Sequence, residues 1–286
     1  MASGLTKTKR RIASVTSTKK ITKAMEMVAT VKLKRFKNGF EQVSRYREEL
    51  REVMGEAFLR DKASASHYSK ENEDVEGTLY LLITSNLGLC AGYNANLYRY
   101  LDSIFDPKKD TLALIGEKGI AHYTREEGER KILEDYAGLD LSMDSRLIFD
   151  AAKTMRNDFS KKKFKKVVAV YTRYVNSLKF EPATSTLLPV QIDFTPDPSE
   201  EFCPPLFEPK PREMIHDILG QYLGSELYAL LVESQLSEQA SRRTAMESAN
   251  DNADELLGKL TIEYNKARQA AITQELTEVV NGANAS

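Results

Sequence analysis

The chain has 286 residues, of which 41% are hydrophobic, so it contains enough apolar material for a buried core. Its two cysteines, Cys90 and Cys203, form no C-x-x-C motif, which argues against a disulfide framework and favours two reduced thiols. No run of about 18 apolar residues is present and the basic N-terminus has no apolar stretch behind it, so we expect neither a membrane-spanning protein nor one secreted by a signal peptide.

The net charge of −1 conceals strong and opposite charges at the two ends of the chain. Residues 1–35 contain ten Lys or Arg against a single acid, Glu26, whereas residues 197–286 contain sixteen acids against seven Lys or Arg. Either the two ends pair with each other or each binds an oppositely charged partner, and the sequence permits both.

Long helices are predicted at both ends because all nine prolines lie between Pro107 and Pro211. At about 1.5 Å per residue, some 50 N-terminal and 70 C-terminal residues would span roughly 75 and 105 Å, too long for a compact globule. Apolar residues follow a heptad-like spacing in both segments, with Arg47 out of pattern. They are Ala29, Leu33, Phe36, Phe40, Val43, Leu50, Met54 and Ala57, and later Met246, Ala249, Ala253, Leu256, Leu260, Tyr264, Ala267 and Ala271.

Between these helices the sequence predicts an α/β sheet, because short apolar runs alternate with helix-like segments. The runs lie at 78–84, 111–116, 165–174 and 187–192. The polar residues 61–77 and the segment 195–211, rich in Pro and acids, are interpreted as linkers. The predicted division is therefore a helix at 1–60, a linker at 61–77, an α/β domain at 78–194, a linker at 195–211 and a helix at 212–286.

No catalytic, cofactor or metal site emerges from the motifs. The stretch "SNLGLCAGYNAN" at 85–96 follows a strand, but Gly88 and Gly92 lack the spacing of a dinucleotide loop, and no P-loop motif is present. A structural strand-to-helix turn is the preferred interpretation. His67, His122 and His216 lie far apart and belong to no ligand motif, and Cys90 is interpreted as a small buried thiol.

The stretch "ITKAMEMVATVKLKR" at 21–35 raises the question of what so basic a helix contacts. Because acids almost vanish from residues 1–35, the lysines cannot all be balanced within the helix, and we expect an acidic partner surface. Nucleic acid fits less well, since residues 1–35 contain no aromatic side chain for base stacking. A solvated helix face is the alternative.

Several collinear motifs resemble the γ subunit family of F-type ATP synthases. They are "IASVTSTKKITKAMEMVATVKLKR" (12–35), "LITSNLGLCAGYNANL", "IGEKG", "VYTRYVNSLKFEPATSTLLP", "LFEPKP" and the C-terminal "ASRRTAMESANDNADELLGKLTIEYNKARQAAITQELTEVVNGANA" (240–285). The sequence departs from the family pattern at Ala91, where glycine is commoner, and at Arg243, where methionine is usual.

The resemblance implies a long antiparallel coiled coil of the N- and C-terminal helices with an inserted Rossmann-like α/β domain. It implies a rotor shaft that turns inside a ring of three α and three β subunits and rests on the ε subunit and the membrane c-ring. Ion flow, of protons or sodium, would thereby be coupled to ATP synthesis or hydrolysis, with the nucleotides bound by α and β. The chain itself would be non-catalytic, without a cofactor, and peripheral on the cytoplasmic side of a bacterial plasma membrane.

The same resemblance implies five partner-contact residues. Met25, with its neighbour Lys23, would lie near an acidic segment of β, Arg268 and Gln269 would contact a loop of β, and Glu208 would face the c-ring. Small and flexible side chains along 21–35 suit a surface that turns against changing neighbours.

Two other classes of function remain compatible with the residues alone. One is an α/β enzyme whose helical arms recruit partners, which saturable nucleotide binding would reveal. The other is a basic nucleic-acid adaptor, which would show a steep dependence of affinity on salt.

Overall fold

The computed structural model describes residues 2–125, 130–133, 136, 139, 145–192, 194, 208 and 210–284, and the chain divides into two compact units. Unit 1 combines Met1–Val31 with Arg242–Ser286, and unit 2 is Lys32–Ser241. Helices α1 (Ala2–Arg60) and α6 (Pro211–Asn284) contribute to both units. The part of α1 after Val31 and the part of α6 before Arg242 therefore belong to the same unit as the sheet. The finer division at 60, 77, 194 and 211 stays a prediction.

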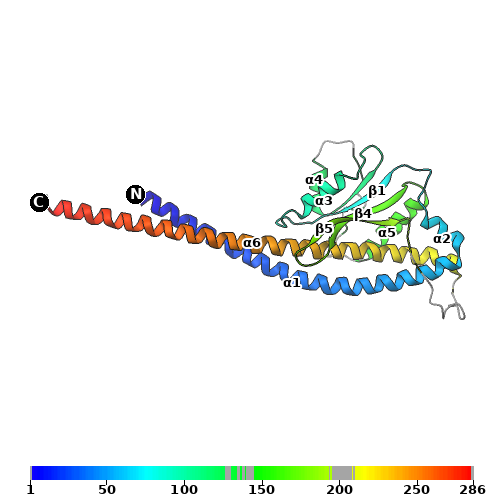
Figure 1. The fold of residues 1–286 in the computed structure, drawn as a ribbon. Coiled ribbons are helices and arrows are strands. Elements are labelled where there is room, and N and C mark those ends of the chain that lie inside the picture. The colour runs from blue at the N-terminus through cyan, green and yellow to red at the C-terminus, as the bar shows by residue number, and fades with distance from the viewer. Residues whose placement is uncertain are drawn as a thin grey trace. The chain divides into compact units, whose positions relative to one another are not determined.

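In unit 1, α1 and α6 run antiparallel to each other (Figure 1). Lys19 pairs with Asp254, while Asn250 donates a 2.6 Å hydrogen bond to Glu26 and accepts one from Thr22. Residue numbers thus rise along α1 as they fall along α6. The opposite charges of the two chain ends meet here, at least in the Lys19–Asp254 pair.

The heptad-like spacing identified the inward-facing side chains of both helices with one error. All eight predicted positions of α1 are buried or half-buried, and so are seven of the eight in α6. Leu256 is the exception, since it is exposed and Leu257 is half-buried in its place. The inward positions run 253, 257, 260 and 264, so the order of the three- and four-residue steps is reversed at this point.

Unit 2 contains a five-stranded sheet in the order β3-β2-β1-β4-β5, in which only β5 is antiparallel. The strands are β1 (Thr78–Ile83), β2 (Thr111–Ile115), β3 (Lys131–Leu133), β4 (Lys166–Tyr174) and β5 (Phe180–Leu188). The shorter helices are α2 (Lys62–Ser69), α3 (Tyr93–Asp102), α4 (Glu117–Tyr123) and α5 (Ser145–Ser160). This parallel-rich, mixed α/β architecture agrees with the fold class expected for the middle of the chain.

Helices cover both faces of the sheet, which explains why β1 is buried along its whole length. Leu79 and Leu81 point into a cluster that includes residues of α1, α5 and α6, whereas Tyr80 and Leu82 point to the opposite face and its cluster with α3. A close approach brings α5 against α6, because a Cβ on Gly224 would lie 2.3 Å from a ring carbon of Phe149.

Two of the predicted elements differ from the structure. The run 187–192 was expected to be a strand, but β5 ends at Leu188 and begins at Phe180, paired with β4 through a turn around Asn176. This strand lacks a clear apolar pattern because it contains polar Thr and Ser residues together with Pro182. Pro182 is tolerated because β5 lies at the edge of the sheet.

Part of the predicted linker 61–77 is helical. Residues 62–69 form α2, whose first turn is capped by the Asp61 carboxylate, which accepts hydrogen bonds from the Ser64 amide and hydroxyl at 3.1 and 2.8 Å. Ala65 and Tyr68 are buried on the other side of this helix. Most of the second predicted linker, 195–211, lies outside the described residues, as does Cys203.

Candidate partner-contact surfaces

Lys23 and Met25 lie on the α1 segment of unit 1. The Lys23 ammonium is 3.0 Å from the carboxylate of Glu26, and the lysine side chain is 56% exposed. The hydrogen bond from Lys23 lowers the pKa of Glu26, and a second hydrogen bond from Asn250 and the nearby charge of Arg243 act in the same direction. Met25 is half-buried, so its flexible side chain lies at the boundary between the helix pair and solvent. Lys23 is therefore partly neutralised within the chain.

Four apolar side chains beside Met25 are mostly exposed, and the sequence reasoning missed three of them, Ile21, Val28 and Val31. Ile21, Met27, Val28 and Val31 are between 56% and 70% exposed. They fall outside the inward-facing heptad positions, which is the signal that could have identified them. Exposed apolar residues next to lysines are typical of protein-contact surfaces.

Arg268 and Gln269 lie on the α6 segment of unit 1, and both are exposed. Their neighbours Ala267 and Ala271 are half-buried, so the two polar side chains project to the side of the inward-facing stripe, where a long guanidinium can reach a partner. The main-chain carbonyl of Gln269 accepts a 3.0 Å hydrogen bond from Thr273.

The structure does not bring the two predicted contact pairs together. Since Asn250 lies opposite Thr22 and Glu26, Met25 is near the level of residue 248. Arg268 is some 20 residues further along α6, or about 30 Å. Lys23 and Met25 therefore form one candidate contact region of unit 1, and Arg268 and Gln269 form a second.

Beyond Arg268 the exposed surface of α6 becomes strongly apolar. By the same register, Ala2 at the start of α1 lies near the level of residue 271, so the remaining turns of α6 have no described partner helix in unit 1. The exposed apolar side chains of this part are Ile272, Leu276, Val279 and Val280. They form a third surface.

Glu208, the predicted contact with a c-ring, belongs to unit 2 and is exposed. Its immediate neighbours in sequence lie outside the described residues, so the structure places this carboxylate without defining a surface around it.

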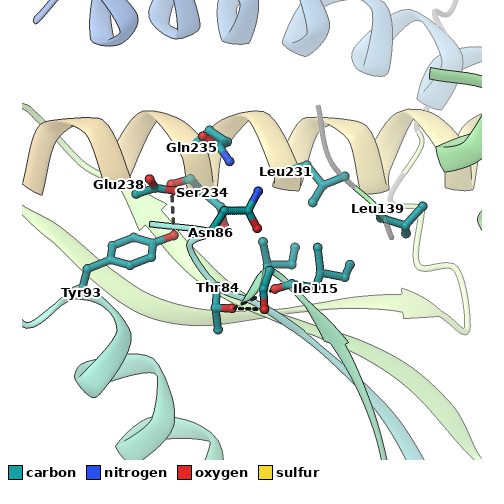
Figure 2. Close-up of a pocket in the computed structure, with 11 residues that line it drawn as sticks. Thr84, Asn86, Tyr93, Ile115, Leu139, Leu231, Ser234, Gln235 and Glu238 are labelled. Atoms are coloured by element: carbon teal, nitrogen blue, oxygen red, sulfur yellow. Dashed lines mark hydrogen bonds between the residues drawn. The ribbon is translucent and has the colours of Figure 1, made fainter. Parts of the chain in front are cut away.

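The carboxyl edge of the sheet, where α/β proteins commonly bind ligands, is largely filled by α6. A cavity of only about 10 Å³ remains between the ends of β1 and β2 and the helix, which is room for about one water molecule (Figure 2). It is lined by Thr84, Asn86 and Tyr93 on the sheet side and by Ser234 and Glu238 on α6. A nucleotide needs a pocket of several hundred Å³.

The loop at 85–96 adopts the strand-to-helix turn expected of it. Cys90 is buried as a thiol, and Asn94 accepts a hydrogen bond from the Ser85 amide at 3.1 Å, which closes the turn. Leu89 and Ala91 both have positive φ, of 60° and 48°. Within the described ranges, no group of three or more His, Cys, Asp or Glu could hold a metal ion.

In the part of the chain that the structure describes, no helix combines the length and the apolar content that a bilayer requires.

Comparison with known proteins shows what the chain is similar to. Residues 4–285 match the family model described as ATP synthase. The chain is 34% identical to the ATP synthase gamma chain of Mesoplasma florum, over 98% of both chains, and 36% identical to that of Mycoplasmopsis pulmonis, over 97% of this chain and 98% of the relative.

Solved structures agree at the level of the fold. The rotor of the Euglena gracilis mitochondrial ATP synthase in rotational state 1 superposes with a TM-score of 0.62 at 20% identity, over 95% of this chain and all of that chain. In rotational state 3, a chain of the Euglena complex of OSCP, F1 and c-ring gives 0.66 at 21% identity, over 100% and 95%. With a family match along almost its entire length and curated relatives that share a third of its residues, the chain belongs to the ATP synthase gamma chain family.

Proposed function

We propose that the chain is the central rotor shaft of an ATP synthase, turning inside a ring of three α and three β subunits. Rotation couples the flow of protons or sodium ions through a membrane c-ring to ATP synthesis or hydrolysis at the β subunits. The γ chains to which it is related and the rotor structures with its fold support this assignment.

The observation that carries the proposal is the exposed apolar surface of unit 1. Its helix pair exposes Ile21, Val28 and Val31, and the final turns of α6 expose Leu276 and Val279. Apolar residues so placed on a narrow pair of helices require a cover, and a surrounding ring of subunits provides one. The exposed basic residues of the same unit favour an acidic lining for that ring. They are Lys7, Lys9, Arg10, Arg11, Lys20 and Lys23.

The proposal includes individual contacts, which the exposed or half-buried positions of the side chains support. Lys23 and Met25 face an acidic segment of β, and Arg268 and Gln269 bind a loop of β about 30 Å away along the shaft. Glu208 faces the c-ring, and the ε subunit binds unit 2. Met25 contributes a weak, adaptable contact that remains similar as the shaft turns, because an unbranched thioether adapts its shape to changing neighbours.

The finer architecture belongs to the same proposal. The antiparallel segments of α1 and α6 wind into a left-handed coiled coil, as their alternating three- and four-residue steps favour. The chain is non-catalytic, binds no cofactor, and is held peripherally at the cytoplasmic face of a bacterial plasma membrane through the c-ring, without inserting into the bilayer.

Co-purification tests the assignment. Tagged chain expressed in its own cells should bring down α and β subunits at three copies each per copy of this chain, and membranes that contain the complex should pump ions when given ATP. Recovery of the chain as a free protein, or with nucleic acid in a salt-sensitive complex, would contradict the proposal.

A further inference from the structure

A row of four hydrogen bonds joins α6 to the carboxyl edge of the sheet, all within unit 2. We name it the α6 seam. Its members are Tyr93 Oη to Ser234 O at 3.1 Å, the Tyr174 amide to Glu233 Oε1 at 3.0 Å, Ser237 Oγ to Thr172 O at 3.0 Å, and Ser241 Oγ to Cys90 O at 2.7 Å. The Tyr93 bond is drawn in Figure 2.

The seam is buried. Ser237 and Ser241 are at most 1% exposed, and Glu233 is 7% exposed. Water therefore cannot replace a partner that moves away, and each broken bond would leave a buried polar group unsatisfied. The apolar contacts around the seam are non-directional and tolerate sliding, whereas these hydrogen bonds hold only over a narrow range of distance and angle.

The geometry restrains α6 in two ways. Residues 233, 237 and 241 are four apart, so they lie on one face of α6 and extend over about 12 Å of its length. Their partners come from two separate places, the loop that follows β1 and the end of β4. A helix held along one face, from two strand ends, can neither slide along its axis nor turn about it without breaking the row.

We propose that the α6 seam transmits torque between α6 and the α/β sheet. It fixes the rotational angle of the helix against the sheet, so that force applied to one is passed to the other without slip. Ser237 and Ser241 are positioning residues in this device. The helix thereby occupies the edge at which other α/β sheets bind ligands. The inference rests on the proposed rotor function and names the residues through which that rotor stays rigid.

The test compares the removal of hydroxyls that join α6 to the sheet with the removal of a hydroxyl that bonds only within α6. Ser237→Ala and Ser241→Ala, singly and together, each delete one bond of the seam. Ser225→Ala is the matched control, because the Ser225 hydroxyl is equally buried on α6 but donates to Tyr222 O of its own helix at 2.8 Å. The complex is assembled with each variant, and ion pumping is measured per ATP hydrolysed.

The double variant should hydrolyse ATP while pumping at least twofold fewer ions per ATP, with the single variants in between and Ser225→Ala equal to the wild type. In the isolated chain, amides of residues 232–241 should exchange with deuterium roughly fivefold faster for each hydroxyl lost. A mere loss of stability lowers the yield of complex but leaves the ratio of ions to ATP unchanged.

The outcomes separate the two proposals. If the wild-type chain fails to assemble with α and β subunits, the rotor assignment itself is wrong. If the wild type pumps and the double variant pumps with the same ratio as Ser225→Ala, the seam does not transmit torque. Should the double variant fail to assemble, the single variants decide, and ratios equal to that of the control overturn the inference.

Discussion

Met25 is a half-buried side chain between the helix pair and solvent, with the exposed Met27 and Val28 close by in sequence. We expect Met25→Lys to lower ion pumping per ATP more than it lowers assembly. A fixed cation would bind an acidic partner strongly in one rotary position, whereas a thioether contacts all positions weakly. Met25→Leu keeps the size without the charge and serves as the control. Pumping ratios that are the same for the lysine, leucine and wild-type chains would contradict the role given to this residue.

Ala91 occupies a backbone conformation that favours glycine. Its φ of 48° lies in the left-handed region, where a Cβ costs about 1 kcal/mol or more, partly offset by the greater freedom of glycine in the unfolded chain. We expect Ala91→Gly to raise the free energy of unfolding by about 0.5 kcal/mol, as followed by denaturant titration. Ala95→Gly, at an exposed position in α3, should instead lower it by about 1 kcal/mol. Destabilisation by both changes would show that the loop is not strained at residue 91.

At the scale of one helix, α6 carries a buried carboxylate whose ionisation opposes folding. Burial raises the pKa of Glu233, although the hydrogen bond from the Tyr174 amide and the charges of Arg47 and Arg173 act against the rise. The folded chain therefore binds this proton more tightly than the unfolded chain. Its contribution to stability is largest below the unfolded pKa and is lost as pH rises through the folded value.

Glu233→Gln should consequently stabilise the chain relative to the wild type by an amount that grows as pH rises above the usual carboxyl range. The amide oxygen of glutamine can still accept from Tyr174, so the hydrogen bond is kept. Urea unfolding at a series of pH values provides the measurement. Glu247→Gln, at an exposed position of the same helix, is the comparison for the loss of one negative charge. A difference for residue 233 that shrinks with rising pH would contradict the assignment.

The elements that the sequence predicted well are those whose burial leaves a clear apolar pattern. The two terminal helices follow from the absence of proline and the heptad-like spacing, and strands β1, β2 and β4 follow from short apolar runs, because a strand inside a covered sheet is buried on both faces. Strand β5 escaped since an edge strand may carry polar residues, and β3 is too short to show a pattern. Helix α2 depends on a cap at Asp61 that a composition-based division ignores.

Side-chain placements that depend on contacts between residues far apart in the chain could not be predicted from the sequence. Arg47 broke the heptad pattern, and the structure accounts for it by an ion pair with Glu226 at 3.7 Å, between residues far apart in the chain. Leu256 and Leu257 could not be distinguished because either fits an apolar stripe. The α6 seam could not be predicted either, because a serine in a helix does not indicate which distant strand or loop its hydroxyl will bond to.

At the scale of the whole molecule, the isolated chain should associate through the end of α6. Ile272, Leu276 and Val279 are exposed there and have no cover within the described residues. We expect Leu276→Ser with Val279→Ser to reduce self-association of the isolated chain in light scattering, without change in helix content. Thr273→Ser with Thr277→Ser alters exposed polar neighbours and should have no effect. A wild-type chain that is monodisperse and equal to both variants would show that this surface needs no partner.

Unit 1 is built from the two ends of the chain, and this fixes when it can form during synthesis. Its first part, Met1–Val31, leaves the ribosome before some 210 residues of unit 2 have been made, and its second part begins only at Arg242. At about 5 to 20 residues per second, the wait is about 10 to 40 seconds. Through that interval the nascent basic segment has neither Asp254 nor Asn250 to pair with, while unit 2 is free to fold. A chaperone or an already assembled acidic subunit that binds residues 1–31 during this time would therefore act on the chain before its rotor shaft exists.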